Sequence, residues 1–390
     1  MLIFGYDREF TYFQLMITRQ KESELRKRIH QGKLLVIIGP RQVGKTTLMK
    51  QVLDFPNEKV LWLNCDNPDD RQSLFEVTTS ALKSLIGGYK LVVIDEAQRV
   101  PNIGLTLKIL ADEFPEVQVI ASGSSALDLA NSIKEPLTGR IREFQLHPIS
   151  IEELCLHTSP REEKRLLERR MIFGFYPEVI NHPSEAQEAL QEITSSYLYK
   201  DILSLADVRM PTVLQKLLLA LALQVGSEVT FNDLGNTIGI DKETAEKYLD
   251  LLEKAFVIFR LNSFSRNMRR ELKKSRKIYF WDNGVRNAII NNFNSLDLRN
   301  DKGALWENFI ISERMKYLSY NRIHSNVYFW RTTTGKELDW LEEREGKLFA
   351  FEAKWNPERR AKLPLGFEEA YPETEFRVVN RENYLDVLTQ

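Results

Sequence analysis

The chain has 390 residues, 43% of them hydrophobic and 28% charged, which is enough for about two or three domains with buried cores. Its 54 Lys and Arg residues are balanced by 55 Asp and Glu residues, giving a formal net charge of −1. Bulk charge therefore excludes no partner and predicts none, and a role in nucleic-acid binding requires a local excess of basic residues.

The cysteines, Cys65 and Cys155, form no CxxC pair, and the five histidines show no metal-ligand spacing. Apolar runs such as residues 217–223 are far shorter than the roughly 20 residues that cross a bilayer. The first ten residues contain acids where a signal peptide would be apolar. We therefore expect a protein of the reducing cytoplasm, without a disulfide framework, a protein-held zinc site or a membrane helix.

The first half of the chain alternates strand-like and helix-like segments. Mixed charges at helical spacing predict a helical lead-in over residues 1–31. Four apolar runs follow, at residues 34–38, 60–64, 91–95 and 117–121. This alternation is typical of a parallel sheet covered by helices on both faces. We predict an α/β domain over residues 32–150, ended by a Pro- and Gly-rich stretch at 134–148, and a helical lid over residues 151–210.

Directly after the first strand, the sequence GPRQVGKTT satisfies the GxxxxGK[ST] pattern in its strand-to-helix context. Such a loop points backbone N–H groups at phosphates, and the following helix adds its positive end. We expect Lys45 to contact the β- and γ-phosphates of ATP and the Thr46 hydroxyl to bind Mg²⁺. The predicted nucleotide contacts are Gly39, Pro40, Arg41, Gln42, Val43, Gly44, Lys45, Thr46 and Thr47.

Further residues are predicted to complete this site. The strand at 91–95 delivers Asp95, which would hold Mg²⁺ through water, and Glu96, which would orient and deprotonate the attacking water. Ser122 ends the next strand, where a group that senses the γ-phosphate would lie, although a serine-rich turn is equally typical of a helix cap. Arg140 and Arg142 are candidates to stabilise transition-state charge, in cis or from a neighbouring chain, or are ordinary surface arginines.

The pattern changes near residue 211. Predicted helices at 213–224, 231–237 and 242–254 precede an alternating strand at 257–264, which is the order of a winged helix-turn-helix, expected over residues 211–265. The third helix carries a net charge of −1, which favours packing or a protein partner over DNA readout. From Arg260 to Lys277, eight basic residues and the single acid Glu271 give a local charge of +7. This stretch is a candidate DNA or RNA contact, or else a solvated loop.

Residues 275–390 are predicted to form an α+β domain that carries an acidic constellation. Glu307 lies on a predicted helix and Asp339 on a strand, while Glu352 and Lys354 alternate on the next strand and so face one side of it. This set is similar to the PD-(D/E)xK nuclease arrangement, in which carboxylates hold Mg²⁺ that activates water and a lysine assists. An ExK pair alone arises readily by chance. Even where the nuclease-like fold is present, it does not imply nuclease activity, which stays open.

Together the motifs resemble one family. The phosphate loop, VIDEAQ at residues 93–98, SGSS at 122–125 and LTGRIREFQLHPIS at 137–150 are similar to the AAA-type ATPases of the archaeal and bacterial AAA_14 plus DUF4143 family. The similarity continues through residues 174–177, 199–202 and 282–284 to the C-terminal acids, whereas residues 1–11 do not resemble the usual start of the family.

The resemblance implies a P-loop core with an additional strand and a catalytic glutamate, a winged-helix middle and a restriction-endonuclease-like end. It also implies that Arg140 is a better arginine-finger candidate than Arg142. We expect an ATP-hydrolysing protein whose nucleotide state controls its C-terminal half. Two hypotheses remain: an ATP-driven nucleic-acid enzyme, or an ATP-gated module with an inactive nuclease-like end that binds a protein through the winged helix. The oligomeric state stays open.

Overall fold

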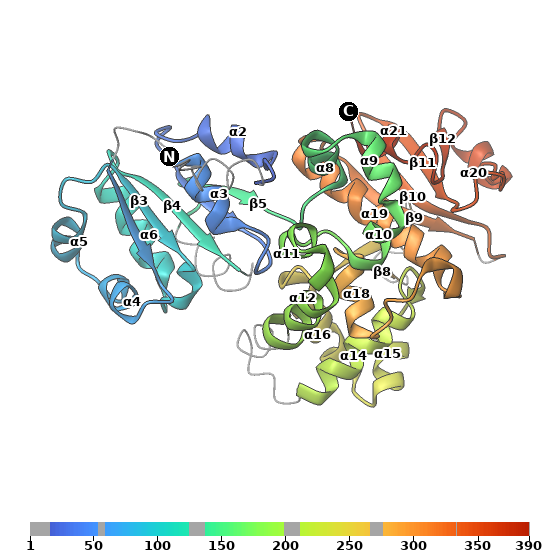
Figure 1. Cartoon of the computed structure of the whole chain (residues 1–390), viewed down its shortest axis with the longest axis horizontal. Coiled ribbons are helices and arrows are strands. Elements are labelled where there is room, and N and C mark those ends of the chain that lie inside the picture. The colour runs from blue at the N-terminus through green and yellow to red at the C-terminus, as the bar shows by residue number, and fades with distance from the viewer. Residues whose placement is uncertain are drawn as a thin grey trace, which may run out of the picture.

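The computed structural model describes residues 16–53, 59–124, 137–198, 211–265, 276–332 and 334–389. Two β-sheets lie towards opposite ends of the long axis, with the helices that follow the first sheet placed between and beside them (Figure 1). None of the helices in these ranges combines the length and the apolar character that crossing a bilayer requires.

The N-terminal sheet consists of five parallel strands: β1 (Leu34–Ile38), β2 (Val60–Asn64), β3 (Leu91–Asp95), β4 (Gln118–Gly123) and β5 (Ile141–Gln145). Their order, β2-β3-β4-β1-β5, inserts β4 between β1 and β3, which confirms the additional strand that the resemblance implied. Because all five strands are parallel, their carboxyl ends meet at one edge. Sequence patterning missed β5, whose polar residues lie within the Pro- and Gly-rich stretch.

Helices cover both faces of this sheet, as predicted. Alternate residues of β1 enter different hydrophobic clusters: Val36 packs in the cluster that contains Leu107 of α6 (Ile103–Glu113), and Ile37 in the one that contains Leu48 of α3 (Lys45–Val52). Helices α4 (Pro68–Leu74) and α5 (Thr79–Ile86) add to the α6 side. The lead-in helix α2 (Lys21–Arg26) packs on the α3 side, and residues 1–15 of the predicted lead-in lie outside the described ranges.

Short helices connect the two sheets. A capping box formed by Ser150 and Glu153 begins the first of them, because each side chain accepts a backbone N–H of the other residue. The helices are α8 (Ile151–His157), α9 (Pro160–Arg165), α10 (Leu167–Phe173), α11 (Pro177–Asn181), α12 (Ala186–Glu192) and the π-helix η3 (Ile193–Leu198). Residues 199–202, which belong to the family motifs, lie outside the described ranges.

The C-terminal sheet has seven strands in the order β12-β11-β10-β9-β7-β8-β6. These are β6 (Glu228–Val229), β7 (Ile258–Ser263), β8 (Arg276–Phe280), β9 (Asn326–Arg331), β10 (Glu337–Arg344), β11 (Lys347–Ala353) and β12 (Glu375–Val379). Strands β7 and β9 pair in parallel at Asn262 and Ser263. One sheet therefore crosses the boundary that we expected between residues 265 and 275.

Helices from both sides of the expected domain boundary pack against this sheet. The predicted 242–254 helix is α16 (Lys242–Lys254), and Asp241 caps it by accepting the Thr244 N–H at 2.7 Å, as expected. The remaining helices are α14 (Pro211–Leu223), α15 (Phe231–Ile238), α18 (Asn283–Ile289), α19 (Lys302–Tyr320), α20 (Leu365–Ala370) and α21 (Leu385–Leu388). One hydrophobic cluster contains Val36 of the N-terminal sheet, Leu154 of α8 and Phe309 of α19, so the two halves share a core.

Candidate functional site

The phosphate loop connects β1 to α3 at the carboxyl edge of the N-terminal sheet. Gln42 and Gly44 have φ angles of 60° and 91°, which curl the backbone in the way that the motif requires. Gly39 has no room for a side chain, because a Cβ there would lie 2.0 Å from the Leu146 carbonyl oxygen. The glycine spacing therefore serves both the curl and a close backbone approach.

Lys45 and Thr46 begin α3 and point to two different partners. The buried Lys45 ammonium donates to the carbonyl oxygens of Gly39 and Pro40, at 3.0 and 2.9 Å, and so lies against the loop itself. The Thr46 hydroxyl donates to Asp95 Oδ2 at 2.8 Å. These contacts bring the ends of β1 and β3 together, and a hydroxyl beside a carboxylate is a donor set that suits Mg²⁺.

Asp95, Glu96 and Ser122 form the next layer of the site. The fully buried Ser122 hydroxyl donates to Asp95 Oδ1 and accepts the Glu96 N–H at 3.1 Å. Glu96 has a φ of 53°, in the left-handed region, which turns its side chain away from the strand direction. Ser122 therefore orients both acids, and we assign it this positioning contact.

Gln98 is a residue that sequence reasoning missed. Its amide donates to the Glu96 carboxylate and to Ser124 Oγ, the latter at 2.9 Å. Its Oε1 is buried and has no hydrogen-bond partner among the described residues. The position of Gln98, two residues beyond Glu96 in the VIDEAQ motif, was a signal that could have identified it.

A cavity of about 560 Å³ opens over the loop. Gln42, Gly44 and Lys45 line one side of it together with Glu96. The opposite wall comes from α11, α12 and the turn between them and is acidic; it contributes Glu178, Glu185, Glu188 and Glu192. A smaller cavity of about 100 Å³ shares Gly44, Thr47, Pro177 and Asn181 with it, so the two adjoin. Together they can accommodate a phosphate chain and an attached group.

Arg140 does not lie near this cavity. It immediately precedes β5, whose first residue pairs with Leu34, whereas the phosphate loop follows the other end of β1. It is ion-paired with Asp112. Five residues of β1 span about 16 Å, so Arg140 is at the opposite edge of the sheet from the loop. The structure therefore does not bring Arg140 to the phosphate loop of its own chain, and the alternative that it acts on a neighbouring chain stays a prediction.

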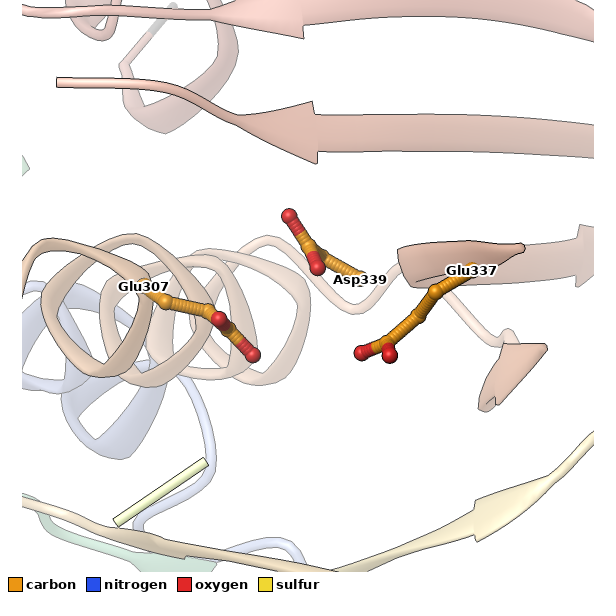
Figure 2. A group of neighbouring side chains, drawn as sticks. All are labelled: Glu307, Glu337 and Asp339. Atoms are coloured by element: carbon orange, nitrogen blue, oxygen red, sulfur yellow. The ribbon is translucent and has the colours of Figure 1, made fainter. Parts of the chain in front are cut away.

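A second site lies in the C-terminal sheet. Carboxylate oxygens of Glu307, Glu337 and Asp339 lie within 4.8 Å of one another. Glu307 projects from α19 towards the other two, which come from β10 (Figure 2). We call these three residues and Glu352 the acidic cluster. The sequence prediction included three of its members and missed Glu337, although Glu337 precedes Asp339 by two residues and so shares its face.

Lys277 of β8 places an ammonium inside the acidic cluster. Only 3% of its side chain is exposed, and it is 2.9 Å from Glu307 Oε1, paired with Glu337 and 3.9 Å from Asp339. Burial lowers the pKa of Lys277, but these carboxylates outweigh burial and raise it. The Tyr279 hydroxyl also donates to Glu307, at 2.7 Å. Strand β8 thus supplies a built-in cation.

Glu352 of β11 completes the acidic cluster, and Lys354, which directly follows this strand, lies beside it. The Lys354 ammonium is 2.6 Å from Glu352 Oε1 and 4.0 Å from Asp339 Oδ2. Glu352 Oε2 is buried and unpaired among the described residues. Burial, followed by the charges of Glu307 and Glu352, raises the pKa of Asp339 well above its ordinary value. The four predicted residues therefore do converge, and a divalent cation or a proton would relieve their repulsion.

Part of the basic stretch is used inside the molecule. Arg260 pairs with Asp250 at 2.8 Å and with Glu253, both on α16. The Arg276 guanidinium lies 4.5 Å from the centre of the Phe231 ring. With Lys277 buried, three of the eight basic residues are engaged. The other five, Arg266, Arg269, Arg270, Lys273 and Lys274, lie outside the described ranges.

Three family models match the chain. An AAA domain model covers residues 31–155, a domain of unknown function (DUF8612) covers 164–296, and a domain of unknown function (DUF4143) covers 302–387. The motif residues 174–177 and 282–284 therefore belong to a model separate from DUF4143, which was not anticipated.

Related sequences come from bacteria and archaea. An uncharacterized protein of Mycobacterium bovis is 29% identical over 345 residues, covering 87% of this chain and 74% of its own length. An uncharacterized protein of Methanocaldococcus jannaschii is 24% identical, with 74% and 69% covered.

Two solved structures are similar at low TM-scores. A RuvB mutant of Thermotoga maritima has a TM-score of 0.34 and 14% identity, with 67% of this chain and 92% of that chain covered. Cdc6p of Pyrobaculum aerophilum has a TM-score of 0.30 and 14% identity, with 74% and 94% covered.

Proposed function

We propose that this chain, which belongs to the family that joins an AAA_14 domain to a DUF4143 region, binds Mg²⁺·ATP in the cavity over the phosphate loop and hydrolyses it. The observation that carries the proposal is the contact between Thr46 and Asp95. It places the two oxygen donors for the metal 2.8 Å apart, beside Lys45 and next to Glu96.

The residues present fit the metal, because a hydroxyl and a carboxylate are hard oxygen donors. When bound, Mg²⁺ would neutralise part of the phosphate charge and orient the terminal phosphate. Lys45 would leave the Gly39 and Pro40 carbonyls and pair with the β- and γ-phosphates. Glu96 would accept a proton from the attacking water, and Gln98 and Ser122 would hold Glu96 in place.

Substitutions at Lys45 and Glu96 test this assignment. Lys45→Ala removes the phosphate contact, so we expect ATP binding to disappear in titration calorimetry. Glu96→Gln keeps the shape of the site but removes the base, so we expect binding to persist while phosphate release falls by about 100-fold or more. Glu113→Gln, at the exposed end of α6, is the matched control and leaves both measurements unchanged. Phosphate release by Glu96→Gln at the normal rate would refute the base assignment.

We further propose that the nucleotide state controls the C-terminal half, in a process that involves nucleic acid. The order α14, β6, α15, α16, β7, β8, with β6 paired to β8, supports the winged-helix interpretation of residues 211–265. The convergence of Glu307, Asp339, Glu352 and Lys354 supports a nuclease-like centre that would hold Mg²⁺. The location of Lys277 within that centre favours the alternative, an ATP-gated module that binds but does not cleave.

Cleavage of nucleic acid distinguishes the two. If the acidic cluster is a nuclease centre, the chain degrades plasmid, single-stranded DNA or RNA with Mg²⁺, and both Asp339→Ala and Lys354→Ala abolish the products on a gel. The assay is run with and without ATP, and Lys347→Ala, at the exposed start of the same strand, is the control. Absence of cleavage by the unmodified chain on all substrates would support the module instead.

A further inference from the structure

Arg19 is a buried arginine that no part of the proposed mechanism uses. It lies just before α2, has 5% of its surface exposed, and contacts four residues in three separate parts of the chain. Its Nη1 donates to the Val43 carbonyl at 2.6 Å, and its Nη2 donates to the His147 carbonyl at 2.7 Å and to the Tyr320 hydroxyl at 3.1 Å. Its Nε pairs with Glu153 at 3.0 Å. One guanidinium thus joins the phosphate loop to the connecting helices and to α19.

The contact with Val43 fixes the most strongly curled part of the phosphate loop. Val43 lies between Gln42 and Gly44, both in the left-handed region. The orientation of its carbonyl therefore determines where the following N–H groups point. The Arg19 guanidinium holds this carbonyl, and so orients the loop, from the side of the smaller cavity, which Arg19 itself lines.

Tyr320 is the last residue of α19 and belongs to the DUF4143 region. Its hydroxyl accepts from Arg19 and also from the His147 N–H, at 3.0 Å. Neighbouring contacts hold the same corner together: Lys21 donates to the Ser319 carbonyl at 3.2 Å, and Arg322 pairs with Glu24. The end of α19 is therefore bound tightly to the segment that supports the phosphate loop.

Helix α19 extends from this corner to the acidic cluster. Its 19 residues span about 28 Å. In its middle, Glu313 accepts the Ile151 N–H at 2.7 Å, and Lys316 donates to the Ile149 carbonyl at 3.2 Å. Near its start, Glu307 contacts Lys277. One rigid element therefore touches the support of the phosphate loop at one end and the acidic cluster at the other.

We propose that Arg19 is a positioning residue for the nucleotide, and that through Arg19 the hydroxyl of Tyr320 in the DUF4143 region sets the affinity of the phosphate loop for ATP. This rests on the proposed binding of ATP and identifies its link to the C-terminal half. Coupling free energies are reciprocal. ATP binding therefore changes the free energy of the Tyr320 hydroxyl contact by the same amount by which this contact changes the free energy of ATP binding.

A double-mutant cycle tests the link. Tyr320→Phe removes one hydroxyl and preserves the ring, and Arg19→Lys keeps a cation for Glu153 but cannot make all four contacts. We expect Tyr320→Phe to raise the Kd for Mg²⁺·ATP by about fivefold, with little change in kcat because no contact reaches Glu96. In the Arg19→Lys background, the same change has no further effect on Kd.

Tyr384→Phe is the matched control. Tyr384 is fully buried in the same region, and its hydroxyl is 3.5 Å from the Glu163 carbonyl, remote from Arg19. We expect this variant to bind ATP normally even where its melting temperature falls as much as that of Tyr320→Phe. Equal weakening of ATP binding by both variants, or additive effects of Tyr320→Phe and Arg19→Lys, would overturn the inference.

Two readouts separate the inference from the function on which it rests. If Tyr320→Phe leaves the Kd for Mg²⁺·ATP unchanged, the inference alone is refuted. If the unmodified chain does not bind Mg²⁺·ATP, both the proposed function and the inference are refuted. Hydrogen exchange adds a direct measurement: ATP is expected to slow exchange at residues 316–323 in the unmodified chain and not in Arg19→Lys.

Discussion

The Asp339 carboxyl illustrates how the fold creates chemistry that is not evident from single residues. It is 9% exposed in its side chain, and its Oδ2 accepts the Ala353 N–H at 2.9 Å. Burial and the nearby charges of Glu307 and Glu352 together favour its protonated form. The acidic cluster therefore stores electrostatic repulsion, which Lys277 and Lys354 reduce.

Asp339 predicts a pH dependence of stability. Because its pKa is raised in the folded chain, the folded state holds this proton more tightly than the unfolded state. Stability therefore declines as the pH rises from the ordinary carboxyl pKa of 3.8 towards the raised value, by about 1.4 kcal/mol for each unit of difference. Urea unfolding at successive pH values should show Asp339→Asn gaining stability relative to the unmodified chain across this range.

The control for this measurement is Asp297→Asn. The Asp297 side chain is 92% exposed, so the difference between this variant and the unmodified chain should stay nearly constant with pH. A constant difference for Asp339→Asn as well would contradict the raised pKa.

At the scale of elements, the family motifs at residues 174–177 and 282–284 pack against each other. Gly174 follows α10, and a Cβ there would lie 2.1 Å from the Asp282 carboxylate. Asp282 accepts the Phe175 N–H at 2.7 Å and caps α18 through the Val285 N–H at 3.1 Å. Gly284 in turn approaches the Phe173 carbonyl closely. These contacts hold α10 against α18, whereas Pro177, the last residue of the first motif, lines the cavity over the phosphate loop.

The basic segment and α16 make different predictions for nucleic acid. Arg260 forms ion pairs with Asp250 and Glu253 of α16. It therefore balances acidic charge on that helix, which has no excess of positive charge to attract DNA. If the chain binds DNA, the residues Arg269, Arg270, Lys273 and Lys274 carry the contact. Replacing all four by Ala should weaken binding of a duplex of about 30 bp and lower its salt dependence by about 0.9 in log–log slope for each phosphate that the variant no longer neutralises.

Lys242 and Lys247 provide the control, because they lie exposed on α16. Their replacement by Ala should leave the affinity for the duplex nearly unchanged in fluorescence anisotropy. Binding that depends on these two lysines and ignores the other four would place the contact on α16.

At the scale of the whole molecule, the two halves are built as one structure. The C-terminal sheet includes strands from both regions that were predicted as separate domains, and α19 crosses from its acidic cluster to the support of the phosphate loop. The cavity over the loop likewise combines the N-terminal core with α11 and α12. The cavity is thus lined both by the N-terminal core and by the helices that follow it.

The sequence predicted most elements because local pattern dominates there. Strands β1, β2 and β3 and helix α16 have the predicted bounds, since continuous apolar runs and a capping Asp241 specify them. Sequence patterning failed for strands whose formation depends on the strands beside them. Strand β5 is polar and forms because β1 offers it an edge, and the two-residue β6 exists only through its pairing with β8.

The sequence by itself predicted the phosphate loop, because its glycines and Lys45 lie within one strand–loop–helix unit. It also predicted Asp95 and Glu96, because they end a second apolar strand and the carboxyl ends of parallel strands meet at one edge of the sheet. Only the tertiary structure decided that Arg140 is remote from the loop, that Lys277 and Glu337 join the acidic cluster, and that Arg19 connects the loop to Tyr320. Such contacts join residues up to 301 positions apart, and their distances depend on how sheets and helices pack, which no local pattern encodes.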